Sequence, residues 1–115
     1  MIIAAVLFAI AALGGVIMAL LRFSGRDYPP VALAVIHGLF AAAGLITLII
    51  AAIAPGVALS IRIALLLFLG AAIGGFSLVY YHAKSRPLPI SYIVVHGLVA
   101  VIAFVILIVG IMARA

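Results

Sequence analysis

The sequence predicts an all-α membrane protein in which four hydrophobic helices form an up-and-down bundle. Of its 115 residues, 72% are hydrophobic and only 6% are charged, whereas a soluble domain is about half apolar and a quarter charged. Charged residues and Pro/Gly breaks divide the chain into four apolar runs. The length of each run is close to that of a helix that crosses the hydrocarbon core of a bilayer, which is about 20 residues. These runs lack the alternation of apolar and polar residues that is typical of a transmembrane β-barrel.

The four predicted spans are Ile2–Leu21, Val31–Ile53, Val57–Tyr81 and Ile90–Met112. Proline pairs precede the second and fourth spans, where the missing N–H costs nothing at a helix start. Connections of a few residues make consecutive helices antiparallel neighbours, so we expect a single transmembrane domain over 1–115. The first run has no basic residues before it and no obvious cleavage site, and we interpret it as a span rather than a signal peptide.

An internal repeat organises the chain. Shifts of 60 and then 59 residues align one half with the other at these positions: Gly14-Gly15 with Gly74-Gly75, Arg26 with Arg86, Pro30 with Pro89, and His37-Gly38-Leu39 with His96-Gly97-Leu98. The pattern predicts a duplicated two-helix hairpin, with repeats at 1–54 and 57–115. Because each repeat has an even number of spans, the copies share one orientation and are related by a pseudo-two-fold axis along the membrane normal.

The charges predict an orientation in the membrane. The first and third loops carry four basic residues, Arg22, Arg26, Lys84 and Arg86, and the opposite side carries two, Arg62 and Arg114. The positive-inside rule therefore places loops 1 and 3 in the cytoplasm and both termini outside, and we expect a bacterial or archaeal inner membrane. The net charge of +5 belongs to these loops and offers no aromatic-interleaved surface for nucleic acid.

Two histidines are placed inside the predicted bilayer at equal depth. His37 and His96 each lie seven residues after the proline that opens their span, which is about 10 Å below the basic loops. The two glycine pairs lie in the same layer. Ionisable residues inside a bilayer are costly and usually face a partner, yet Asp27 is the only acid and lies in a loop. Since the second and fourth helices are diagonal in the bundle, we expect the imidazoles to face each other with a metal between them.

A metal between the two histidines would need further ligands, and a haem supplies them. The chain has no cysteine, and no carboxylate lies near the histidines, so thiolate sites, iron–sulfur clusters and a bare metal centre are disfavoured. A haem brings four equatorial nitrogens and leaves two axial positions for histidine. We therefore predict one haem b ligated by His37 and His96. Its edges would need the space left by Gly14, Gly15, Gly74 and Gly75, and its propionates would face Arg22, Arg26, Lys84 and Arg86.

This arrangement resembles the haem-binding four-helix core of membrane b-type cytochromes, the respiratory cytochrome b and cytochrome b561 kind. The resemblance covers all four spans as a pattern of spacing. It implies an electron-transfer protein that exchanges electrons with a quinone or a partner redox subunit. Such cytochromes commonly carry a second histidine about two heptads further along each helix. Here Ile50 or Ala51 and Val109 or Gly110 stand at that distance, so the resemblance implies one haem at most.

Other functions stay open at this stage. A haem-free structural or assembly subunit of a larger membrane complex, or an oligomer, would need only an apolar surface, and a His-Gly pair can serve helix packing. A small multidrug transporter is disfavoured because no span contains Asp or Glu. The serines and the threonine lack a buried acid and base for hydrolysis, and the sequence leaves open whether the chain is a non-catalytic subunit of an oxidoreductase. We interpret His82 as a hydrated loop histidine rather than a ligand.

Overall fold

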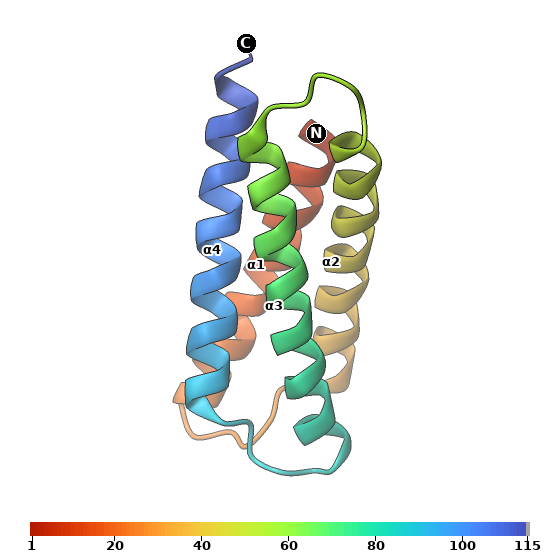
Figure 1. The fold of residues 1–115 in the computed structure, drawn as a ribbon. Coiled ribbons are helices and arrows are strands. Elements are labelled where there is room, and N and C mark those ends of the chain that lie inside the picture. The colour runs from red at the N-terminus through yellow and green to blue at the C-terminus, as the bar shows by residue number, and fades with distance from the viewer. Residues whose placement is uncertain (115) are drawn as a thin grey trace.

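The computed structural model describes residues 1–114 and consists of four helices in an up-and-down bundle (Figure 1). They are α1 (Ile2–Phe23), α2 (Val31–Ala52), α3 (Leu59–Ala83) and α4 (Ile90–Met112). Each is long and apolar enough to cross a membrane, and apolar side chains are exposed on all four. The predicted all-α four-helix bundle is confirmed, and the duplication of a two-helix hairpin stays a prediction. The largest difference in bounds is at α3, which begins and ends two residues later than predicted, so that His82 lies in its last turn.

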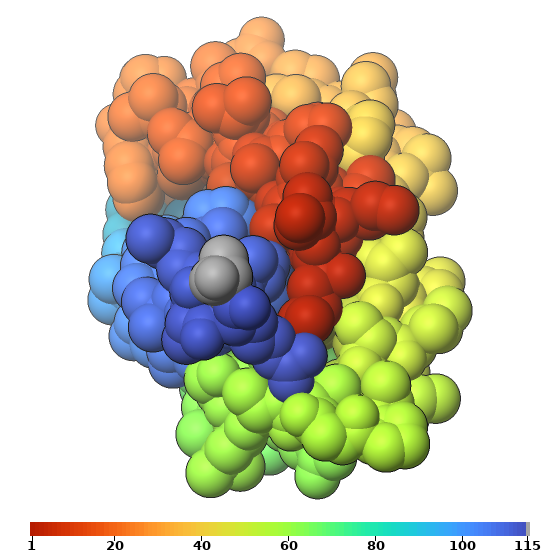
Figure 2. Space-filling model, turned by 90° about the horizontal axis from the view of Figure 1, so that it is seen from above, coloured from red at the N-terminus to blue at the C-terminus, as the bar shows by residue number. Residues whose placement is uncertain are grey.

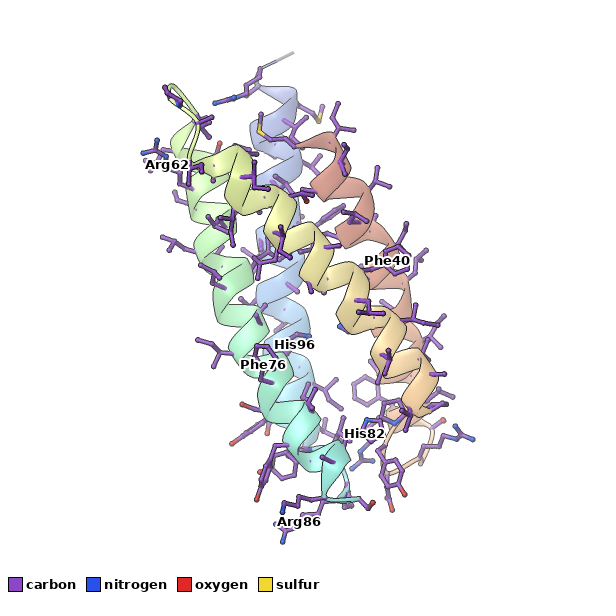
Figure 3. The ribbon with its side chains drawn as sticks, turned by 90° about the vertical axis from the view of Figure 1, so that its right-hand side faces the viewer. Phe40, Arg62, Phe76, His82, Arg86 and His96 are labelled. Carbon is purple, nitrogen blue, oxygen red and sulfur yellow. The ribbon has the colours of Figure 1, made fainter. Side chains whose placement is uncertain are left out.

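The bundle has two different ends. Both termini and the α2–α3 loop lie at one end, which we call the terminal end, and the α1–α2 and α3–α4 loops lie at the other, the basic end (Figure 1). Within each hairpin, α1 with α2 and α3 with α4, the helices are in close contact along their length, whereas the two hairpins contact each other much less. Figure 3 shows the hairpins diverging toward the basic end.

The terminal half of the bundle holds the packed core. Leu48, Ile61 and Leu107 are fully buried there, and the rings of Phe8 and Phe68 stack across the α1–α3 diagonal with centroids 3.7 Å apart. Seen from this end, the start of α1 lies between the end of α4 and the end of α2 (Figure 2). A Cβ added to Gly110 would come within 2.7 Å of the Ser60 hydroxyl. The side chains of the terminal half are therefore closely packed.

The basic half is packed differently. Its helical positions, none of which is buried, are 12–22 in α1, 31–43 in α2, 72–83 in α3 and 90–102 in α4. A bundle with a filled axis buries residues in every turn or two of each helix, because each helix turns an apolar stripe toward the others. The basic half is therefore loosely packed between the hairpins.

The two loops meet over this loosely packed half. The amide of Leu88 donates to the carbonyl of Asp27 at 2.9 Å, and Nε of Arg22 donates to the carbonyl of Leu88 at 2.9 Å. Pro29 and Leu88, which align in the repeat, are both buried. Each hairpin thus contacts the loop of the other at the basic end.

The first and third helices end in the same capping motif with different residues. After α1, Gly25 has φ +112 and the Arg26 amide donates to the carbonyl of Leu21. After α3, Ser85 takes the left-handed position with φ +50 and the Arg86 amide donates to the carbonyl of Tyr81. Both are Schellman caps, in which glycine is the favoured residue. Ser85 therefore stores backbone strain that Gly25 avoids.

We expect Ser85→Gly to stabilise the protein by about 1 kcal/mol, because glycine removes the steric cost of a left-handed residue, and Gly25→Ser to destabilise it by a similar amount. Thermal unfolding in detergent micelles measures both. Ser24→Gly is the matched control, since Ser24 has φ −79 and no need for glycine. An equal gain from Ser24→Gly and Ser85→Gly would contradict the role of the left-handed backbone.

Candidate functional site

The structure brings His37 of α2 and His96 of α4 together across the bundle. Their ring centroids are 6.2 Å apart and their planes are inclined by 73°. Both side chains are half-buried and lie where the packed terminal half gives way to the loosely packed basic half. Figure 3 shows His96 on the inner side of α4, between the hairpins. No other imidazole lies at this level in the described chain.

A hydrogen bond within each hairpin fixes each ring. Nδ1 of His37 lies 2.7 Å from the carbonyl oxygen of Ala11, and Nδ1 of His96 lies 2.7 Å from that of Ala71. Because a carbonyl oxygen can only accept, Nδ1 carries the proton, and in a neutral imidazole Nε2 then keeps a free lone pair. Metal-ligating histidines commonly donate their other ring N–H to a backbone carbonyl, which fixes the tautomer and the ring orientation. The two hairpins thus hold their imidazoles in the same way, each through Nδ1.

The glycine pairs determine how closely these rings approach α1 and α3. A Cβ on Gly15 would lie 3.2 Å from Cε1 of His37, and one on Gly75 would lie 3.3 Å from Cε1 of His96. Gly14 and Gly74 would place a Cβ in ordinary contact, 3.5 Å from the histidine Cβ atoms. Each glycine pair therefore leaves space for the histidine of its own hairpin. The sequence analysis missed this role of the glycines.

The spacing of Ala11 and Gly15 contains a signal for this role. In a helix the Cβ of a residue is tilted toward the N-terminus and lies on the same face as the residue four positions earlier. Glycine at 15 and at 75 therefore uncovers the backbone carbonyls of residues 11 and 71. The imidazole reaches its acceptor through the space of the missing side chain.

Of the four basic residues predicted to face a cofactor, the structure brings only Arg22 into contact with the opposite hairpin. Arg26, Lys84 and Arg86 are exposed, and their side chains make no hydrogen bond to any residue in 1–114. The Lys84 ammonium lies 6.0 Å from the centroid of the Tyr80 ring. Figure 3 shows Arg86 pointing away from the bundle at the basic end.

The interpretation of His82 as a hydrated loop histidine is wrong. His82 belongs to α3, and its ring centroid lies 5.3 Å from that of Tyr28 in the first loop. Its Nε2 is buried and has no hydrogen-bond partner within residues 1–114. The reason is that α3 continues past Tyr81 and that the loop of the other hairpin covers its last turn. The repeat offered a signal, since a shift of 60 residues aligns His82 with the inward-reaching Arg22.

The distance between the two histidine rings bears on the predicted metal between them. Among the described residues, no three side chains of His, Cys, Asp or Glu are grouped to hold a bare ion. Metal–imidazole bonds are about 2.0 Å, and a five-membered ring with bonds of about 1.35 Å has a radius of about 1.15 Å. Two imidazoles on opposite sides of one metal therefore have centroids about 6.3 Å apart. The observed separation of 6.2 Å is close to this value, and it also lies within the range of about 4.5 to 7 Å for two rings in edge-to-face contact.

We expect Gly15→Val to break the hydrogen bond between His37 and Ala11, because the new side chain occupies the place of the imidazole. The ¹⁵N NMR spectrum of histidine-labelled protein in micelles reports the protonated ring nitrogen directly. The His37 signals should shift while those of His96 stay unchanged, which makes the second hairpin an internal control.

Gly38→Val is the matched control for this substitution, since a Cβ on Gly38 meets nothing within 4 Å in the described structure. It should leave both histidine signals in place. An unchanged His37 signal in Gly15→Val would mean that Gly15 does not position the ring.

Comparison of the chain with protein-family models, with curated proteins and with solved structures finds no match in any of the three. The resemblance to membrane b-type cytochromes stays a prediction, and the functional conclusion rests on the residues of the chain itself.

Proposed function

We propose that this integral membrane protein transfers electrons through one b-type haem, held between α2 and α4 with His37 and His96 as axial ligands. The observation that carries the proposal is the pair of imidazoles 6.2 Å apart, each anchored through Nδ1 so that Nε2 is free. The loose packing between the hairpins in the basic half also supports the proposal, because a planar ligand needs space between helices whose side chains do not interlock. We call this space between the two hairpins the seam.

The haem would supply reversible one-electron Fe(III)/Fe(II) chemistry when bound. The chain's own residues would supply the rest. The carbonyls of Ala11 and Ala71 would orient the two rings. The packed terminal half would exclude water on one side of the histidine pair, and the α1–α2 and α3–α4 loops would cover the other side.

The position of the pair near one end of the bundle bears on its partners. A single redox centre near one face cannot carry charge across the whole membrane. We therefore propose exchange with a quinone diffusing in the bilayer or with a redox subunit that contacts the exposed apolar helices. The basic end would face the cytoplasm of a bacterial or archaeal cell by the positive-inside rule.

A haem-free structural subunit of a larger complex is the second candidate. The contacts of Gly15 and Gly75 with the histidines give each His-Gly pair a packing role that needs no cofactor. An open apolar groove of about 300 Å³ between α1 and α4, lined by residues such as Val6, Phe104 and Ile108, offers a surface for another membrane helix. The absorption spectrum separates the two candidates.

Protein purified in detergent from haem-replete cells should be red and show the sharp reduced bands of six-coordinate low-spin haem b. His37→Ala or His96→Ala should leave five-coordinate or lost haem, because the third imidazole, that of His82, lies seven residues along α3 from Gly75, which is about 10 Å from the histidine layer. Free imidazole should partly restore the low-spin spectrum by occupying the vacated position. Absorption spectra of each variant, with and without imidazole, measure this.

His82→Phe is the control for ligation and should leave the positions of the absorption bands unchanged. Colourless wild-type protein that stays colourless after haem addition would favour the structural subunit. An unchanged six-coordinate spectrum in both alanine variants would place the axial ligands elsewhere.

The proposed orientation is tested by labelling. Cysteines introduced at Ser24 and Ser85 should resist a membrane-impermeant thiol reagent applied to intact cells, whereas a cysteine appended after residue 115 should react. Labelling after cell lysis shows that all three thiols are competent. The reverse pattern in intact cells would place the basic end outside.

A further inference from the structure

The starting point is the buried Nε2 of His82, which lacks a hydrogen-bond partner in the described chain. An imidazole nitrogen removed from water without a partner costs free energy, and such exceptions call for an explanation. The ring does not face lipid, because it lies against Tyr28 in the loop of the opposite hairpin. Nε2 is therefore held in the seam between the hairpins at the basic end, as Figure 3 shows for the labelled side chain.

Arg22 occupies the corresponding place on the other hairpin. It lies seven residues after Gly15, as His82 lies seven residues after Gly75. Both residues are therefore about 10 Å from the histidine layer along the helix axis. Arg22 also reaches across the seam, where Nε donates to the carbonyl of Leu88. That bond uses one of five guanidinium donors and leaves the terminal nitrogens available.

The setting favours an anion. Arg26, Lys84 and Arg86 surround this end of the bundle, and no ion pair joins any residue of the described chain. Asp27 engages the seam through its backbone carbonyl. Two donors on opposite hairpins, with unbalanced positive charge around them, match a ligand with two carboxylates.

We infer that Arg22 and His82 form a two-point carboxylate site that takes the two propionates of the haem, one on each hairpin. The inference rests on the proposed function, since a haem ligated from α2 and α4 presents its edges to α1 and α3, which carry these two residues. His82 would donate from Nε2 to one carboxylate and Arg22 from its terminal nitrogens to the other. The three exposed basic residues then contribute only diffuse charge.

The test uses the full chain purified without haem and titrated with iron protoporphyrin IX or with its dimethyl ester, which lacks both carboxylates. Absorbance reports the affinity for each. Wild-type protein should bind the diacid about ten- to a hundredfold more tightly than the diester, the range expected for hydrogen bonds to charged groups. His82→Phe, which keeps a ring against Tyr28, should lose about tenfold for the diacid and nothing for the diester.

Arg22→Met should behave in the same way, and His82→Gln, which keeps a donor, should recover most of the affinity for the diacid. Arg26→Gln and Lys84→Gln are the matched controls and should change either affinity less than twofold, because exposed charges contribute little. Circular dichroism of each variant confirms that the helices are retained.

The outcomes separate the inference from the proposed function. If neither porphyrin binds to wild-type protein, the proposed haem site itself fails. If both porphyrins bind equally, or if His82→Phe weakens both by the same factor, the haem site stands but His82 and Arg22 do not recognise its carboxylates.

Discussion

The arrangement of His37 and His96 depends on one interaction, the hydrogen bond between the histidine Nδ1 and a backbone carbonyl of the preceding helix. In the hydrocarbon core there is no water to satisfy an imidazole N–H, and an unsatisfied polar group costs several kcal/mol. Each imidazole therefore requires an acceptor within its own hairpin. Only a carbonyl uncovered by glycine is accessible, so Gly15 and Gly75 follow from His37 and His96. The same bond turns Nε2 of each ring away from the backbone that anchors it.

The two halves of the bundle have different physical tasks. In the terminal half, the stacked rings of Phe8 and Phe68 and the buried side chains between them hold the hairpins together. In the basic half the hairpins meet mainly through their loops. Elements with few buried apolar contacts are the ones that open most readily. The pair of histidines lies at the boundary between the packed core and the loosely packed half.

The apolar runs between charged residues and Pro/Gly breaks predicted the four spans to within two residues, because a bilayer demands long apolar helices and tolerates charge only at their ends. The repeat predicted that His37 and His96 share a layer with the two glycine pairs. The contact between Gly15 and its own histidine could be reached only with the interhelical distance known. His82 was misread because its burial depends on the path of a loop from the other hairpin, and local sequence does not encode that path. The exposure of Arg26, Lys84 and Arg86 could not be predicted either, because it also depends on the paths of the loops.

One detail of the loop contact breaks the likeness between the two hairpins. The Leu88 amide donates to the carbonyl of Asp27, and the residue that aligns with Leu88 in the first repeat is Pro29, which has no amide hydrogen to give. Full two-fold symmetry would place a reciprocal pair of backbone bonds at the basic end, whereas one backbone bond is present, beside the bond from Arg22 to the carbonyl of Leu88. Both hydrogen bonds between the hairpins at this end thus involve Leu88, so the connection of the two loops depends on this one residue.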